Sequence, residues 1–278
     1  MLISQVLDTV RSRLELPDHP ERTMDTVKIG DPEQICTGIA VTVYVSVNVI
    51  RSAVKNGCNL IIGHEPLFYG DAEGSPLIEK NPVYMEKRRL LEEYGIVVYR
   101  HHDRMHGPGG PGAKVHTRID HIYYGIMKEL GWEEYVIGEH TKPVMYRIPE
   151  TTGNELAQIL LKSFDLKGMR IVGDPDTKVR TVYLCEHVFG SEHDYEIIEK
   201  ASQADAVIPL EIVDWTLTEY IRDCCQCGKK KVIFEMGHFN TEELGMRYMT
   251  KWLRELLGGQ EKVIFIPSGD QFEYMTRF

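Results

Sequence analysis

The sequence predicts an α/β fold, in which helices alternate with short apolar strands. Compact apolar segments rich in β-branched residues recur along the chain, as expected for buried strands. Amphipathic segments of helical length separate them, which is the pattern of layered α/β proteins. The first such series is a strand at Ile39–Val43, a helix at Ser46–Asn56 and a strand at Asn59–Ile62. The same rhythm returns in the second half of the chain.

The remaining elements follow in order. In the first half we expect an amphipathic helix within residues 1–23, a helix at Pro82–Tyr94, a strand at Ile96–Tyr99 and a helix at Asp120–Leu130. In the second half we expect helices at Asn154–Phe164, Asp194–Ser202, Asp214–Cys225 and Thr241–Leu257, with strands at Thr181–Cys185, Ala206–Ile208, Val232–Glu235 and Val263–Ile266. Pro82 suits a helix start, and Gly131 and Gly258 suit helix ends.

Composition limits the classes of function. The 278 residues suffice for one large core or two packed halves, and 42% hydrophobic with 27% charged residues is ordinary for a globular protein. The net charge of −10 gives no general attraction to nucleic acid or to a membrane surface. No segment approaches the ~20 apolar residues that span a bilayer, and the N-terminus lacks the pattern of a signal peptide. We therefore expect a cytoplasmic protein.

Candidate metal ligands follow two strands of the first half. The strand ending at Ile62 leads into His64 and Glu65, and the strand ending at Tyr99 leads into a segment with four potential ligands. Those four are His101, His102, Asp103 and His106. Imidazole and carboxylate groups suit zinc, iron or manganese. The glycine-rich segment from His106 to Lys114 is either a mobile loop at the mouth of a site or a simple connector.

A third cluster follows the strand that ends near Met236. His238 and Glu242 are four residues apart near the start of a predicted helix, so both side chains lie on one helical face. Polar residues at the carboxyl ends of strands lie where α/β proteins gather their ligands. Three such clusters together favour a metal centre, in which Glu242 could bridge two ions about 3.5–4 Å apart.

These segments resemble the Nif-three-like family, the dinuclear-metal homologues of GTP cyclohydrolase 1 type 2. Residues 25–30 are similar to the family's N-terminal "WDxxGLxxG", residues 59–69 to "DLIITHHPLFF", and residues 237–242 to "GHxxSE". The order and spacing of the matches cover most of the chain.

Two departures affect the ligand set. The family's histidine pair is His64-Glu65 here, and the added negative charge favours a harder ion. In the segment similar to "VYxxHTNxD", His102 falls on the motif histidine and His106 on its ligating aspartate. Asp103 could be the ligand instead. His116–Asp120 also reads like "HTNxD", but we favour His106 over Asp120 because it follows the strand.

The resemblance implies an α/β fold of two similar halves, with two divalent metal ions in the cleft between them. The implied metal ligands are His64, Glu65, His102, His106, His238 and Glu242. It also implies a ring-shaped hexamer. The chain would form a single Nif-three-like domain over 1–278, with halves at 1–135 and 136–278 and no inserted middle domain.

Two functions are compatible with such a centre. The first is a metal-dependent hydrolase of the GTP cyclohydrolase 1 type 2 class, acting on a nucleotide or related small molecule, with Asp103 or His102 as orienting group or general base. Arg100 and Arg104 would then hold a phosphate or form ion pairs. The second is a metal-binding regulatory or metal-handling oligomer without turnover. A third interpretation is that the histidines are structural and bind no metal.

Overall fold

The chain forms two compact units, each built on a five-stranded sheet. A computed structural model describes residues 1–14, 22–70, 75–107 and 119–275. The first unit comprises Met1–Gly125 and Gly245–Ser268, and the second comprises Ile126–Leu244 and Gly269–Phe278. Helices and strands alternate through both units, so the predicted α/β fold class is confirmed.

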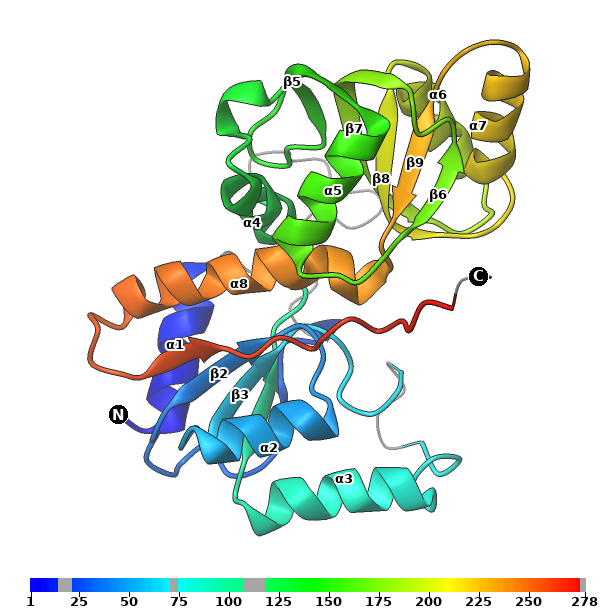
Figure 1. The fold of residues 1–278 in the computed structure, drawn as a ribbon. Helices are drawn as coiled ribbons and strands as arrows, with labels where there is room; N and C mark the ends of the chain where they lie inside the picture. The colour runs from blue at the N-terminus through cyan, green and yellow to red at the C-terminus, as the bar shows by residue number, and fades with distance from the viewer. Residues whose placement is uncertain (15–21, 71–74, 108–118, 276–278) are drawn as a thin grey trace. The chain divides into compact units, whose positions relative to one another are not determined.

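The first unit has the strand order β1-β4-β3-β2-β10, of which Figure 1 labels β2 and β3. The last four strands run parallel to one another, and β1 pairs antiparallel with β4 at one edge. The strands are β1 (Val27–Ile29), β2 (Ile39–Thr42), β3 (Leu60–Gly63), β4 (Val97–Arg100) and β10 (Val263–Phe265). Because β10 pairs with β2, residues from near the end of the chain complete the first sheet.

Helices cover the first sheet with apolar stripes. One face of the sheet, including Ile61 and Val98, packs in one buried cluster with Ile50 and Leu91 from two helices. The helices are α1 (Ile3–Arg13), α2 (Val47–Lys55), α3 (Pro82–Glu93), and the parts of α4 (His121–Leu130) and α8 (His238–Leu256) that belong to this unit. The hydroxyl of Ser46 accepts from the Val49 amide and begins α2. The carboxyl ends of β3 and β4 therefore lie side by side on a rigid scaffold.

The second unit has the strand order β5-β7-β8-β9-β6 (Figure 1). The three central strands are parallel, and the two edge strands pair antiparallel with them. The strands are β5 (Met145–Thr152), β6 (Arg170–Gly173), β7 (Lys178–Val188), β8 (Ala206–Ile212) and β9 (Val232–Glu235), and the helices are α5 (Gly153–Phe164), α6 (Asp194–Ser202) and α7 (Leu217–Gln226). Ile197 of α6 and Ile221 of α7 pack with Val207 and Ile233 of the sheet in one buried cluster.

Three strands were not expected from the sequence: β1, β5 and β6. Two strands extend three or four residues beyond their predicted ends, β7 to Val188 and β8 to Ile212. Helix α8 begins at His238 rather than near Thr241. Within the described ranges, no helix combines the length and apolar character needed to cross a bilayer.

Candidate metal centre

Three histidines of the first unit converge beyond the ends of β3 and β4. His64 follows β3 and is fully buried, while His102 and His106 lie in the turn after β4. Since β3 and β4 are parallel neighbours, both segments leave the sheet at the same edge. The strand pairing thus brings together residues that are about forty positions apart in the sequence, as the 42-residue separation of His64 and His106 shows.

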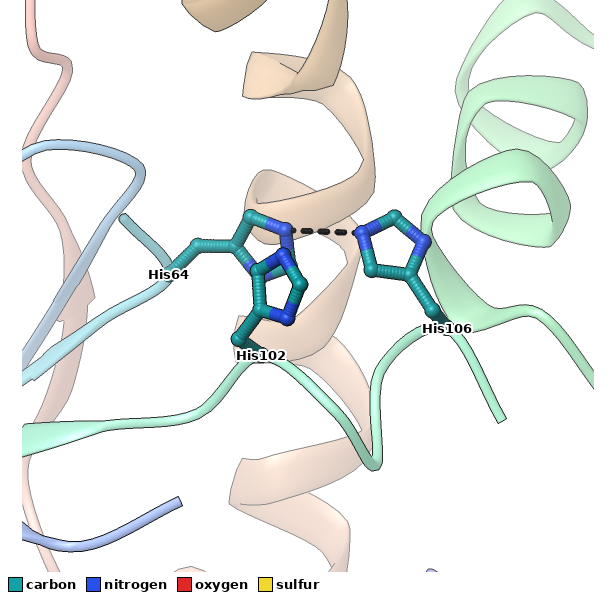
Figure 2. Close-up of side chains that lie close together, drawn as sticks. All are labelled: His64, His102 and His106. Carbon is teal, nitrogen blue, oxygen red and sulfur yellow. Dashed lines mark hydrogen bonds between the residues drawn. The ribbon is translucent and has the colours of Figure 1, made fainter. Parts of the chain in front are cut away.

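The ring nitrogens of this histidine group face one another. His64 Nε2 lies 3.1 Å from His106 Nε2, the contact dashed in Figure 2. The three ring centroids are 4.7 to 4.9 Å apart, and one ligand atom from each ring lies within 4.8 Å of the others. Two ligands on one zinc ion, each about 2.0–2.1 Å from the metal, have a similar separation. The spacing of the group therefore suits a shared cation.

The other ring nitrogen of each histidine meets an acceptor. His64 Nδ1 is 3.0 Å from the carbonyl oxygen of His101, which can only accept, so this nitrogen carries the proton. His102 Nδ1 is 3.0 Å from Asp103 Oδ1, and His106 Nδ1 is 3.3 Å from Asp120 Oδ2. Acceptors at Nδ1 leave the lone pair on Nε2, an arrangement that metal-bound histidines share.

Asp103 and Asp120, the two alternatives to His106 as a metal ligand, each face the Nδ1 atom of a histidine. Asp103 accepts from the Thr23 hydroxyl and the Met24 amide, each at 2.8 Å, as well as facing His102. Burial raises the pKa of Asp103, but the hydrogen bonds from His102, Met24 and Thr23 outweigh it, and the net pKa is lowered. The carboxylate is therefore ionised and orients the imidazole.

Asp120 begins helix α4 as well as facing His106. Its Oδ1 accepts from the Ile122 and Tyr123 amides, each at 3.1 Å. The carboxylate thereby offers one oxygen to the helix terminus and the other to His106. His116 and the two residues after it in the rival motif lie outside the described residues, as does most of the glycine-rich segment.

Asp25 organises the turn that carries His102, although the sequence did not single it out as a site residue. Its buried carboxylate accepts from the amides of His102 at 2.7 Å, Asp103 at 2.8 Å and Arg104 at 3.0 Å, and from Arg104 Nη1 at 3.2 Å. Burial acts to raise the pKa of Asp25, but hydrogen bonding and charge from His101 and the backbone donors lower it well below its usual range. The ionised carboxylate of Asp25 is therefore a structural part of the turn.

Glu65 and the two arginines nearest the histidines are buried. Arg100 Nη2 lies 4.0 Å from Glu65 Oε2, and Arg100 Nε donates to the carbonyl of His64 at 3.1 Å. Arg104 pairs with Asp25. Both arginines therefore support the turn internally, which argues against the alternative that they hold a phosphate.

The second unit brings together the other two predicted ligands. His238 and Glu242 are one turn apart on α8, with His238 Nε2 at 3.4 Å from Glu242 Oε2. His238 Nδ1 is 3.4 Å from Glu211, a residue that the sequence did not indicate, and His187 lies beside both. Whether His238 and Glu242 share an ion with His64 and its neighbours stays a prediction.

These features define an α/β protein with histidines and carboxylates at the carboxyl ends of its parallel strands. The sequence profile of the Duf34/NIF3 (NGG1p interacting factor 3) family matches residues 1–271, so the chain belongs to this family. The resemblance inferred from the motifs is confirmed.

Proteins described as GTP cyclohydrolase 1 type 2 homologues are similar in sequence. The one from Clostridium acetobutylicum is 23% identical over 242 residues, covering 82% of this chain and 81% of its own length. The one from Clostridium perfringens is 22% identical over 260 residues, covering 89% of each. A crystal structure of a Bacillus cereus protein related to NIF3 matches with a TM-score of 0.69 at 15% identity, covering 98% of this chain and 99% of that one. At this identity the match shows the fold alone.

Proposed function

We propose that the protein binds two divalent metal ions and uses them to hydrolyse a nucleotide or a related small molecule. The proposed ligands are His64, Glu65, His102, His106, His238 and Glu242. Zinc, iron and manganese all suit this set of nitrogen and oxygen donors. The names of the clostridial relatives favour the GTP cyclohydrolase 1 type 2 class of reaction.

The contact between His64 and His106 carries the proposal. Their Nε2 atoms are 3.1 Å apart, while each Nδ1 faces an oxygen acceptor. Two lone pairs at this distance repel each other unless a proton or a metal ion lies between them. His64 is buried, which makes an imidazolium at His64 costly, and a metal ion between the two nitrogens would remove the repulsion.

Bound divalent ions supply Lewis acidity, which activates water and polarises the bond under attack. The chain's own residues hold the ligand side chains in their orientations. Asp103 and Asp120 fix the rings of His102 and His106, and Asp25 fixes the turn between them. The lowered pKa of Asp103 makes this carboxylate a weak base, so we propose it as the orienting group for His102.

Turnover by the reloaded protein tests the proposal. The protein is stripped with a chelator, reloaded with manganese, iron or zinc, and assayed on GTP, other nucleotides and phosphoesters. We expect turnover with at least one ion, and its loss in His64→Ala, His106→Ala and Glu242→Ala proteins. A His193→Ala protein is the matched control, because His193 pairs with Glu186 and Glu196 and is not among the proposed ligands. Turnover that survives all three substitutions would contradict the proposal.

A non-catalytic metal-handling role is the second candidate, favoured by the partial exposure of His238, which is open to exchange of an ion with solvent. Tight, reversible metal uptake without turnover on the whole panel would support it over the hydrolase. We also propose a cytoplasmic homo-oligomer, with the hexamer that the family resemblance implies. Light scattering after size-exclusion chromatography tests the hexamer, for which a monomeric mass would be the contrary result.

A further inference from the structure

The carboxyl ends of β7, β8 and β9 carry a second group of potential ligands, all within the second unit. His187 and Glu211 are direct partners in the register of β7 and β8, so their side chains leave the sheet on the same face. His238 begins α8 just after β9. Three adjacent parallel strands thus deliver two imidazoles and a carboxylate to one edge of the sheet, where α/β proteins form sites.

The spacing of these three side chains suits metal ligands, since one ligand atom from each lies within 4.8 Å of the others. Glu211 Oε2 lies 3.4 Å from His238 Nδ1 and 3.8 Å from His187 Nδ1, and the two imidazole centroids are 4.5 Å apart. Nitrogen and oxygen ligands with bonds of 2.0–2.1 Å around a tetrahedral ion are about 3.3 Å apart, so a small contraction closes the group around a cation.

We propose that His187, Glu211 and His238 form a metal-binding site for a divalent first-row transition ion. This site goes beyond the proposed function, since it lies in one unit and two of its ligands belong to no predicted set. Two imidazoles and one carboxylate are a known ligand set of zinc, and they leave coordination positions open.

The exposure of the three side chains and the packing against His187 both suit an ion that arrives from solvent. The side chains of Glu211, His187 and His238 are 49%, 30% and 24% exposed. The ring of Phe189 stacks on His187 with centroids 5.1 Å apart and only 5° between the planes, which restrains the imidazole.

The two ring nitrogens of His238 face different carboxylates. Its Nδ1 faces the exposed Glu211, and its Nε2 faces Glu242, which is fully buried. A neutral imidazole has one lone pair, so His238 binds an ion on only one of these sides at a time. Loading of the exposed site and ligation next to Glu242 therefore exclude each other.

Cobalt titration of the full-length protein tests the site. A His64→Ala, His106→Ala double variant removes the histidine group of the first unit and serves as the background. We expect it to bind one Co²⁺, followed by its visible absorption, with an affinity that falls by about tenfold or more when His187→Ala or Glu211→Gln is added. His193→Ala is the control with a similar histidine–carboxylate pairing, and it should leave the affinity unchanged. Far-UV circular dichroism verifies that each variant is folded.

The variant Glu242→Gln tests which ring nitrogen of His238 binds the ion. If the ion binds at Nδ1, Co²⁺ affinity in the background persists with Glu242→Gln. Affinity that depends on Glu242 but not on His187 would overturn the site, as would a background that binds no Co²⁺. Failure of the proposed function is a distinct outcome, because the wild-type protein would then bind no more Co²⁺ than the double variant.

Discussion

Replacing Asp25 by asparagine should destabilise the first unit strongly. The carboxylate accepts three backbone amides of the turn and the guanidinium of Arg104, all at 2.7 to 3.2 Å. An amide keeps one acceptor oxygen, so the donors at the other oxygen lose their partner. Hydrogen bonds to a charged group contribute about 1.5–3 kcal/mol each, and an unpaired buried ion costs about 3–5 kcal/mol. Because these losses overlap, we expect Asp25→Asn to lower the free energy of unfolding by about 4 kcal/mol.

Urea unfolding followed by circular dichroism at pH 7 measures this loss. Asp8→Asn is the matched control, because Asp8 is an exposed carboxylate paired with Arg11 at 3.2 Å. Its replacement should cost less than about 1 kcal/mol. A loss for Asp25→Asn no larger than that of the control would refute the role assigned to Asp25.

The pH dependence of the loss has a defined sign. The folded-state pKa of Asp25 is lowered, so its contribution is fully present above the unfolded pKa of about 3.9 and is lost as pH falls towards the folded pKa. The gap in stability between wild type and Asp25→Asn should therefore narrow below about pH 4. A gap that widens on acidification would contradict the reasoning.

Two further predictions concern buried positions of the first unit. Burial lowers the pKa of Lys87 to about 7, so its charged form is penalised at low pH and the penalty is relieved as pH rises from about 7 towards 10.5. Lys87→Met should stabilise the protein near pH 6 and remove this rise in thermal-unfolding scans, whereas Met at the exposed Lys80 should do neither. A Cβ at Gly245 would lie 2.8 Å from Ile122 Cα, so Gly245→Ala should lower stability by about 1–3 kcal/mol, although alanine favours helices. Unfolding of Glu255→Ala, an exposed position on the same helix, provides the comparison, and an equal or higher stability for Gly245→Ala would contradict the close helix packing.

The sequence predicted the central strands and missed the antiparallel edges. Strand β9 and helix α6 have the expected bounds, because a buried parallel strand or an amphipathic helix has a clear apolar signature. The three missed strands all pair antiparallel at sheet edges. Edge strands are partly exposed, and β5 contains Pro149, so their composition resembles that of loops.

The accuracy of the predicted strand ends decided which site residues were found. His64, His102 and His106 were found because the ends of β3 and β4 were placed nearly correctly. His187 and Glu211 were missed because β7 and β8 were expected to end at Cys185 and Ile208. The apolar alternation of Leu210 and Ile212 was the signal that could have extended β8.

The role of Asp25 could not be inferred from the sequence, although the first motif match begins at this residue. Three of its four donors are backbone amides, which are present at every residue other than proline. Only the fold shows that a chain segment 77 to 79 residues away supplies them.

The position of a bound ion tests the central claim most directly. We expect a crystal structure of the zinc-loaded protein, measured at the zinc absorption edge, to contain an anomalous peak about 2.0–2.1 Å from both His64 Nε2 and His106 Nε2. A fully loaded protein without a peak beside these two atoms, or with the metal on their Nδ1 side, would contradict the account.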